Sequence, residues 1–355
     1  MNEQEKYDWM VYVRCMTYNQ APYIVDAMNG FTMQETNFPF VCAVVDDAST
    51  DGEQEVIKSY LDEHFDLKDK KIARHEETED YVLTFARHKT NLNCYFAVFY
   101  LKYNHYKKKT KGPYLAQWRE KAKYIALCEG DDYWIDAEKL QKQCEFLNSH
   151  EECTLVFHNA YVEDADSSIR NGVHKISNES KYIPLSKIIR DGGLIPTLSI
   201  LYRRESFSEY KDFPSNCPVG DLRLQTYAAI IGKVYYINEI MGVYRLVSSS
   251  FTHLIAKDVN KYVNHHKKFI EWYISVNEYT DYKFEEEVKG AIAFSESRIY
   301  IAEKKYHKMW NPKYFGFIMN LSLTSRIGLF FKMMGMSWLY RIGHSIMKFY
   351  RDKLK

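Results

Sequence analysis

The chain has 355 residues, of which 46% are hydrophobic and 27% are charged. A chain of this size is too long for one small module and can bury a substantial core, so we expect one large domain with an appendage. The seven cysteines are odd in number and include no C-x-x-C pair. This pattern fits neither a disulfide framework nor a zinc ribbon, and it favours a reducing cytosol.

The C-terminal segment differs in charge from the rest of the chain. Residues 311–355 contain eight Lys or Arg and one acid, which gives this segment +7 while the whole chain carries +1. Such a concentration of charge could meet an anionic partner. The N-terminal sequence MNEQEKYDWM has no basic start followed by an apolar run, so we expect no signal peptide. No stretch reaches the roughly 18 uninterrupted apolar residues that a membrane-spanning helix needs.

Strand-like and helix-like segments alternate through the first half of the chain, which predicts an α/β fold with a mostly parallel central sheet flanked by helices. Strands are expected at residues 9–16, 40–45, 71–74 and 124–128, and helices at 24–31, 53–61, 93–106 and 137–148. In such sheets, ligand-binding groups gather at the carboxyl ends of the parallel strands. Two acidic motifs follow predicted strands in this way.

The first acidic motif, DDASTDG, occupies residues 46–52. A carboxylate at the end of a strand can accept a hydrogen bond from the imide N–H of a pyrimidine base. Asp, Ser and Thr are also common helix N-caps, so the same residues fit a turn that only starts the next helix. Taken alone, this motif leaves both interpretations open.

The second acidic motif, EGDDYW at residues 129–134, is more specific. Asp131 and Asp132 are adjacent carboxylates followed by two aromatic residues, and such a pair is costly to bury because like charges repel and aromatic rings exclude water. A divalent cation removes that cost. Mg²⁺ and Mn²⁺ are usually held by one or two carboxylates together with substrate phosphates. The alternative is an acidic turn that caps the helix expected at 137–148.

These motifs resemble those of the family 2 glycosyltransferases of the GT-A fold, especially the bacterial surface-polysaccharide enzymes. The resemblance rests on TYNQAPYI at 17–24, VVDDASTDG at 44–52 and YIALCEGDDYWIDAEKLQKQCEFL at 124–147, with weaker similarity to about residue 250. The three motifs occur in the family's order. The resemblance implies a GT-A-like domain that binds a nucleotide sugar.

The resemblance also implies roles for residues at matching positions. Thr17, Tyr18 and Asn19 would line the nucleoside pocket of the donor site. Asp47 would be the partner of the base, with Asp46 near it.

In the second motif, Asp132 would be the direct ligand of Mn²⁺ or Mg²⁺. Asp131 would complete the metal-binding pair and face the donor sugar and ribose, with Glu129 behind them. The pair Tyr244-Arg245 resembles a donor-contacting segment, so Arg245 is a candidate for the diphosphate, with a solvated surface charge as the alternative. Many relatives carry a His two residues after this pair, where this chain has Val247.

Family members of this type invert the anomeric centre and need a base at the acceptor hydroxyl. Asp221, in the sequence PVGDLRL at residues 218–224, is the best match. The family motif often reads Glu-Asp, and here Gly220 takes the place of the first acid. The alternative is that Asp221 only caps the helix expected at 224–231.

Several other polar residues leave two interpretations open. Arg203 and Arg204 fit either a substrate contact or a solvated surface charge. His158 follows an apolar run and fits a buried histidine better than a ligand. His253 could replace the missing family histidine, although its spacing is wrong.

The last third of the chain is helical in pattern, and its basic tail carries an apolar stripe. The stripe consists of Ile327, Phe331, Met334, Trp338, Ile342, Ile346 and Phe349. A helix of this kind fits either the interface of an anionic membrane or docking on the catalytic domain. We therefore expect a GT-A-like catalytic domain at 1–255, a helical extension at 256–310 and a basic amphipathic segment at 311–355.

Together these features predict an inverting, metal-assisted glycosyltransferase for surface polysaccharide assembly. The donor is a nucleotide sugar, with a UDP-sugar favoured, and the acceptor is a hydroxyl of a saccharide or lipid-linked saccharide. The expected location is cytoplasmic, with peripheral association at the inner face of the cytoplasmic membrane, and no nucleic-acid partner is expected. Two alternatives remain. One is a catalytically inactive relative that binds nucleotide sugars or membrane, and the other is a sugar nucleotidyltransferase, which usually has a Gly-rich phosphate loop that this N-terminus lacks.

Overall fold

The computed structural model describes residues 6–108, 113–165, 169–174, 176–247, 255 and 257–335. The chain forms two compact units. The first consists of Met1–Ile188, Gly193–Lys211 and Leu224–Ser248, and the second of Ile189–Gly192, Asp212–Arg223 and Ser249–Lys355. The division into three segments expected from the sequence stays a prediction. Within the described ranges, no helix combines the length and the apolar character needed to cross a bilayer.

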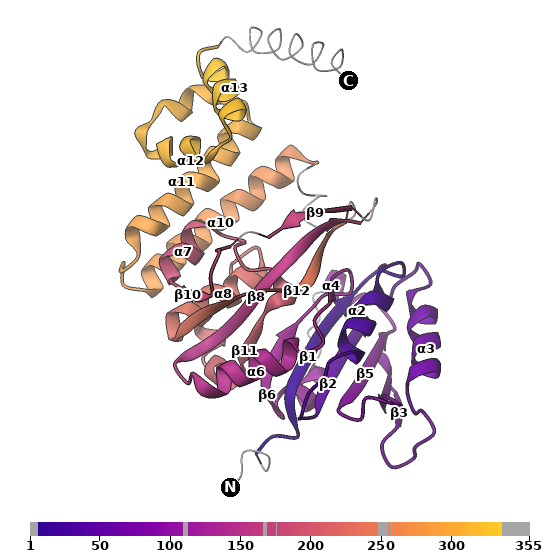
Figure 1. Ribbon diagram of the computed structural model, residues 1–355. Helices are drawn as coiled ribbons and strands as arrows, with labels where there is room; N and C mark the ends of the chain where they lie inside the picture. The colour runs from indigo at the N-terminus through magenta and orange to yellow at the C-terminus, as the bar shows by residue number, and fades with distance from the viewer. Residues whose placement is uncertain are drawn as a thin grey trace, which may run out of the picture. The chain divides into compact units, whose positions relative to one another are not determined.

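One large sheet forms the first unit (Figure 1). Its strands are β1 Trp9–Thr17, β2 Phe40–Asp46, β3 Arg74–Glu77, β4 Tyr81–Arg87, β5 Cys94–Leu101, β6 Ala122–Leu127, β7 Tyr133–Trp134, β8 Cys153–Asp164, β9 Ile169–Val173, β10 Lys181–Ile183, β11 Leu201–Arg203 and β12 Lys233–Leu246. They are ordered β10-β12-β8-β11-β6-β1-β2-β5-β4-β3, with β7 paired to β12 and β9 to β8. The centre, β6-β1-β2-β5, is parallel, and antiparallel strands extend it on both sides.

Helices flank this sheet, which confirms the predicted α/β class. They are α2 Ile24–Thr32, α3 Glu53–His64, α4 His105–Lys108, α5 Ala116–Arg119, α6 Lys139–Ser149, α7 Leu185–Arg190 and α8 Gly220–Ile231. Every residue of β2 is buried, as expected of a parallel strand covered on both faces. The predicted strands at 9–16, 40–45 and 124–128 are confirmed to within three residues.

The predicted helix at 93–106 is wrong. The apolar run Cys94–Leu101 is strand β5, which pairs with β2 on one side and β4 on the other. A continuous apolar run fits a buried strand as well as a buried helix, and here sheet pairing decides the outcome. The predicted strand at 71–74 is also displaced, because residues 70–72 form a turn and β3 begins only at Arg74.

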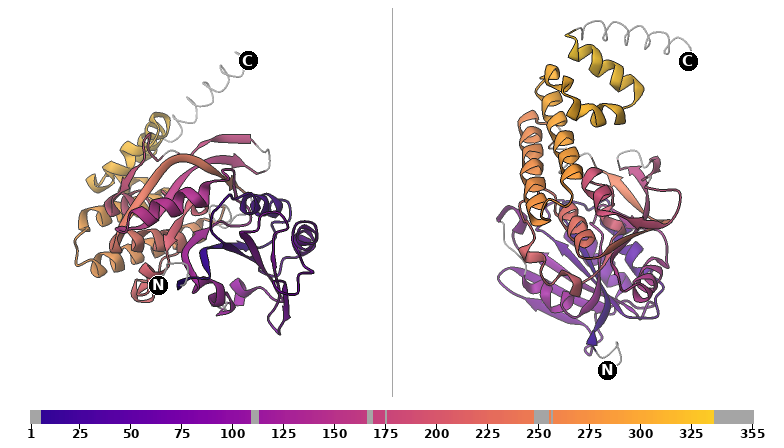
Figure 2. Two further views of the ribbon diagram at one scale, coloured as in Figure 1. Left: turned by 60° about the horizontal axis from the view of Figure 1, so that its bottom comes forward. Right: turned by 90° about the vertical axis from the view of Figure 1, so that its left-hand side faces the viewer.

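The second unit is helical where the structure describes it. Its longer helices are α10 Val259–Tyr279 and α11 Glu285–Ala302, followed by the short 3₁₀ helices Tyr306–Trp310 and Pro312–Tyr314 and by α12 Phe315–Asn320 and α13 Leu323–Met333. α10 and α11 lie side by side (Figure 2). Asp258 caps α10 by accepting hydrogen bonds from the backbone N–H groups of Asn260 and Lys261.

Gly30 of α2 provides a test of this packing. A Cβ added at Gly30 would lie 2.8 Å from the backbone nitrogen of Trp134 and 3.0 Å from its carbonyl oxygen. We expect Gly30→Ala to lower the free energy of unfolding by about 1 to 3 kcal/mol, because backbone atoms cannot move aside easily. Chemical denaturation would measure the change.

Gly290→Ala is the matched control, since Gly290 lies inside α11 and its added Cβ would meet nothing within 4 Å. That substitution should be neutral or stabilising by up to about 1 kcal/mol. Equal effects at the two glycines would contradict the close approach of α2 to β7.

Candidate functional site

The parallel centre of the sheet brings the three sequence motifs to one edge. β1 is parallel to β2 on one side and to β6 on the other, and Thr17 is aligned with Asp46. The segments that follow these strands, 17–20, 46–53 and 129–132, therefore lie at the same carboxyl edge. The sequence predicted this convergence, and the contacts between the segments show how it is held.

Glu53 links the first two segments. Its carboxylate accepts hydrogen bonds from Thr17 Oγ1, from Ser49 Oγ at 2.8 Å and from the backbone N–H of Gln20 at 2.9 Å. The side chain is fully buried, and burial raises its pKa above the usual range. Sequence reasoning treated Glu53 only as the start of a helix. The available signal was an acid placed directly after the turn-forming Gly52, which has a φ of 90°.

Gly130 allows the loop at residues 129–132 to lie against the segment at residues 17–20. A Cβ at this position would lie 2.4 Å from Thr17 Oγ1 and 2.6 Å from Gln20 Oε1. Only glycine allows this approach. Gln20 also hydrogen-bonds with the side chain of Asp131, which favours the ionised carboxylate and partly offsets the effect of burial on its pKa.

Asp131 and Asp132 form an acidic pair in which Asp132 is buried and Asp131 is half-buried. Burial, and then the neighbouring Asp131 carboxylate, raise the pKa of Asp132 well above its usual range, and burial raises the pKa of Asp131. Burial also raises the pKa of Glu129, although its Oε1 accepts a hydrogen bond from Arg14 at 3.3 Å. Holding these carboxylates close together therefore carries an unfavourable electrostatic free energy, which a bound cation would remove.

This acidic pair fits a metal that shares its ligands with a substrate. In the part of the chain that the structure describes, no group of three or more His, Cys, Asp or Glu side chains is arranged to hold a metal ion. Mg²⁺ and Mn²⁺ accept one or two carboxylates when substrate phosphates complete their coordination. Asp131 and Asp132 therefore suit an ion that arrives with a diphosphate.

Arg245 of β12 connects this acidic loop to two further carboxylates. Its backbone N–H donates to Asp132 Oδ1 at 2.8 Å. Its guanidinium pairs with Glu163 at 3.2 Å and also with Asp26 of α2. It lies over the ring of Tyr133, 4.3 Å from the centroid. With 8% of its side chain exposed, Arg245 is not a solvated surface charge, and its contact with a diphosphate stays a prediction.

The carboxylates of Asp46 and Asp47 make different hydrogen bonds. Asp47 accepts hydrogen bonds from two backbone N–H groups at the start of α4, those of His105 at 2.6 Å and Tyr106 at 3.1 Å. Asp46 Oδ1 accepts from Ser49 N at 3.1 Å, whereas its buried Oδ2 has no hydrogen-bond donor among the described residues. Both side chains are buried, and the role of Asp47 as the partner of the base, with Asp46 near it, stays a prediction.

Tyr18 and Asn19 lie on the same loop, and Tyr18 is 37% exposed. Asn19 has a φ of 54°, in the left-handed region that Asn tolerates better than most residues. Its side-chain oxygen accepts from Thr50 N at 2.8 Å, and its backbone N–H donates to Ser49 Oγ at 2.9 Å. These bonds fasten the first loop to the DDASTDG turn.

Asp221 belongs to the second unit, where it is the second residue of α8. It is half-buried, and its Oδ1 accepts the backbone N–H of Leu222 at 2.7 Å. This contact is compatible with a structural role at the helix start, and its role as a base stays a prediction.

The structure settles several of the remaining alternatives. Arg203 donates to the carbonyl oxygens of Cys153 and His150, and Arg204 to that of Ala122, so both hold the sheet together. His158 is fully buried, which confirms its predicted place in the core. His253 lies outside the described residues.

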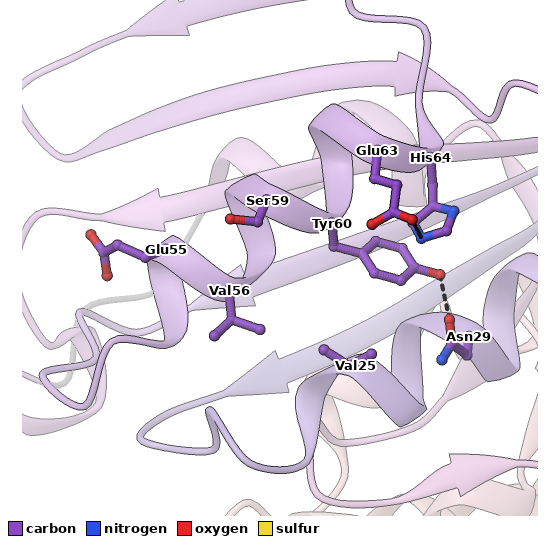
Figure 3. A pocket seen from close by; sticks show the side chains of 8 residues that line it. All are labelled: Val25, Asn29, Glu55, Val56, Ser59, Tyr60, Glu63 and His64. Carbon is purple, nitrogen blue, oxygen red and sulfur yellow. Dashed lines mark hydrogen bonds and ion pairs between the residues drawn. The ribbon is translucent and has the colours of Figure 1, made fainter.

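An open groove of about 620 Å³ separates α2 from α3 (Figure 3). Its walls are Val25, Asn29, Glu55, Val56, Ser59, Tyr60, Glu63 and His64. The Tyr60 hydroxyl donates to Asn29 Oδ1 at 2.9 Å across it. None of the lining residues is among the predicted donor or metal residues.

Comparison with known proteins agrees with this architecture. No family model matches the chain. Uncharacterized proteins of Mycobacterium bovis and Mycobacterium tuberculosis are 30% identical over 259 residues, which is 70% of this chain. The chain spans 62% of the length of these relatives.

Two solved structures share the fold. S. aureus TarS 1-349 in complex with UDP-GlcNAc has a TM-score of 0.53 at 14% identity and covers 97% of this chain and 92% of its own. The mannosyltransferase PcManGT from Pyrobaculum calidifontis, in complex with GDP-Man and Mn²⁺, has a TM-score of 0.50 at 12% identity and covers 97% and 88%. This chain has the GT-A-like fold of these nucleotide-sugar complexes.

The double pairing of Arg245 generates a prediction. Arg245→Met should lower the free energy of unfolding by about 3 to 5 kcal/mol, because it breaks a buried ion pair with Glu163 and a second ion pair with Asp26. Chemical denaturation of the full chain would measure this loss.

The double variant Arg245→Met with Glu163→Gln removes both members of this ion pair and should lose less stability than the sum of the two single variants, because the two residues interact directly. If Arg245→Met alone left stability unchanged, the ion pairs with Asp26 and Glu163 would carry no structural role.

Proposed function

We propose that this chain is an inverting glycosyltransferase that moves a sugar from a nucleoside-diphosphate donor to a hydroxyl of a saccharide or lipid-linked saccharide. The convergence of the three loop segments on one sheet edge carries this proposal, together with a fold shared with two nucleotide-sugar complexes. A site of this kind must recognise a nucleoside, hold a diphosphate and activate an acceptor. Each task has candidate residues in this chain.

The first two loops would recognise the nucleoside. Tyr18 offers a partly exposed ring for stacking, and Asp46 and Asp47 lie at the carboxyl edge of the sheet beside Thr17. Asp47, with Asp46 near it, would accept the imide N–H of a pyrimidine base, which favours a UDP-sugar. Thr17 and Asn19 would shape the pocket through their bonds to Glu53 and the DDASTDG turn.

The acidic pair would bind the donor's diphosphate through Mn²⁺ or Mg²⁺. Asp132 would be the direct ligand, and Asp131 would share the ion or face the ribose and sugar. The ion would neutralise the negative charge that develops on the leaving nucleoside diphosphate. Arg245 would keep Asp132 oriented through its backbone N–H.

Asp221 would serve as the general base. The acceptor hydroxyl would lose its proton to the carboxylate while its oxygen attacks the anomeric carbon. The bond from that carbon to the diphosphate oxygen would break on the opposite face, which inverts the configuration. The products are the glycosylated acceptor and a nucleoside diphosphate.

We further propose that the enzyme acts in the cytoplasm on a surface-polysaccharide precursor. A panel of UDP- and GDP-sugars with Mn²⁺ or Mg²⁺ would test the reaction class, with free nucleoside diphosphate as the readout. Its release with transfer to an acceptor would support the proposal. Release of pyrophosphate from sugar phosphate and nucleoside triphosphate would indicate a nucleotidyltransferase instead.

Asp132→Asn tests the metal site. The neutral amide is a weaker ligand for a hard cation, so transfer should fall by at least about 10²-fold, and metal-dependent donor binding should be lost. Calorimetry with donor and Mn²⁺ would measure binding. Asp62→Asn, at an exposed acid of α3, is the control and should change neither quantity. Full activity in Asp132→Asn would remove the metal from this site.

Asp221→Asn tests the base. Donor affinity should stay unchanged while the transfer rate falls by roughly 10² to 10⁴-fold, the usual contribution of general-base catalysis. Asp212→Asn, at an exposed acid of the same unit, is the control. A parallel loss of donor affinity, rate and thermal stability in Asp221→Asn would show that this residue only supports α8.

A further inference from the structure

The second unit carries an exposed apolar surface on α12 and α13. Its members are large hydrophobic side chains with 45% to 68% of their surface exposed, namely Phe315, Met319, Leu323, Ile327, Phe330 and Met334. The four members at positions 323, 327, 330 and 334 recur at the three- and four-residue spacing of one helix face. Arg326 of α13 donates to the carbonyl oxygen of Met319 at 2.7 Å, which fastens α13 to the end of α12.

The core-facing side of these helices is a different set of residues. Leu329 and Phe317 pack with Ala293, Met309 and Tyr314 in a buried cluster. The exposed surface is therefore not a core face of the second unit. Of the stripe expected from the sequence, Ile327 and Met334 belong to this exposed surface and Phe331 is half-buried. Trp338, Ile342, Ile346 and Phe349 lie outside the described residues.

Positive charge and an aromatic side chain accompany this surface. Residues 304–335 contain six Lys or Arg and no acid. Lys305 and Lys313 pair with Glu303 and Glu296, which lie outside this range, each at 2.8 Å. No ion pair joins Lys304, Lys308 or Lys332 to another described residue. Trp310 is 52% exposed, and its ring lies 5.9 Å from that of Phe330. Anionic lipid attracts such cations, and Trp prefers the boundary between headgroups and acyl chains.

We propose that the exposed apolar surface of α12 and α13 binds an anionic lipid bilayer. The six apolar side chains enter the boundary between headgroups and acyl chains, and Lys304, Lys308 and Lys332 pair with lipid phosphates. The combination of apolar burial and charge attraction gives a peripheral, reversible and salt-sensitive attachment. This surface lies within the second unit, so the proposal does not depend on the chemistry of the donor site.

Sedimentation of the full chain with vesicles tests this proposal without any donor or metal. The chain should bind phosphatidylglycerol-rich vesicles at low salt and bind phosphatidylcholine vesicles much less. The triple variant Leu323→Ser, Ile327→Ser and Phe330→Ser leaves net charge unchanged and should weaken binding by about 10²-fold or more. Circular dichroism would confirm that this variant keeps its helices.

A matched control replaces exposed apolar residues of the first unit. Leu92, Met33 and Ile231 are 59%, 40% and 37% exposed, and their replacement by Ser should leave vesicle binding unchanged. If the triple variant does not fold, quenching of Trp fluorescence by brominated phosphatidylglycerol provides a second readout, and Trp310→Phe should reduce it. Absence of binding, binding that survives the triple variant, or a dimer that the triple variant dissociates would each overturn the proposal.

Discussion

The close burial of like-charged carboxylates is the constraint on which the rest of this site depends. Asp132 is buried and Asp131 is half-buried after strand β6, and the Asp131 carboxylate adds to the effect of burial in raising the pKa of Asp132. Contacts with Gln20 and Arg245 reduce the free-energy cost of ionising these two carboxyls without removing it. Arg14 does the same for Glu129.

Arg245 explains how distant parts of the chain converge on the acidic pair. Its backbone belongs to β12, which pairs with β7 immediately after the acidic loop. Its side chain reaches α2 through Asp26 and β8 through Glu163. Arg245 therefore links the acidic loop at residues 129–132 to helix α2 and to strands β8 and β12. These contacts hold the acidic loop in a defined position within the fold.

The sequence predicted the strand ends and their acidic motifs because apolar runs followed by charged turns have few alternative structures. It could not distinguish the buried strand β5 from a helix, since its continuous apolar run fits both. The sequence also could not predict contacts between segments that lie far apart along the chain. Glu53 binds two loops, and only the folded chain shows that both of its oxygens are used. The sequence also did not predict that the Asp47 carboxylate accepts the two backbone N–H groups at the start of α4.

The buried Lys139 illustrates the same limit. Its Nζ has no hydrogen-bond partner among the described residues and lies 3.8 Å from the ring centroid of Trp134. Burial lowers its pKa to about 7. In the sequence this residue reads as one charged position of an amphipathic helix. Only the folded structure shows that Lys139 is buried against the ring of Trp134.

Proton release on metal binding tests the central claim most directly. If Mn²⁺ replaces protons on the paired carboxyls, its binding must release protons over the pH range in which these groups titrate. Burial raises both pKa values, and the Asp131 carboxylate raises that of Asp132 further. Calorimetric titration of the full chain with Mn²⁺, in two buffers that differ in ionisation enthalpy, would count these protons. The account predicts net proton release that falls as the pH rises and that is reduced in Asp132→Asn. Mn²⁺ binding without proton release, or unchanged release in that variant, would contradict it.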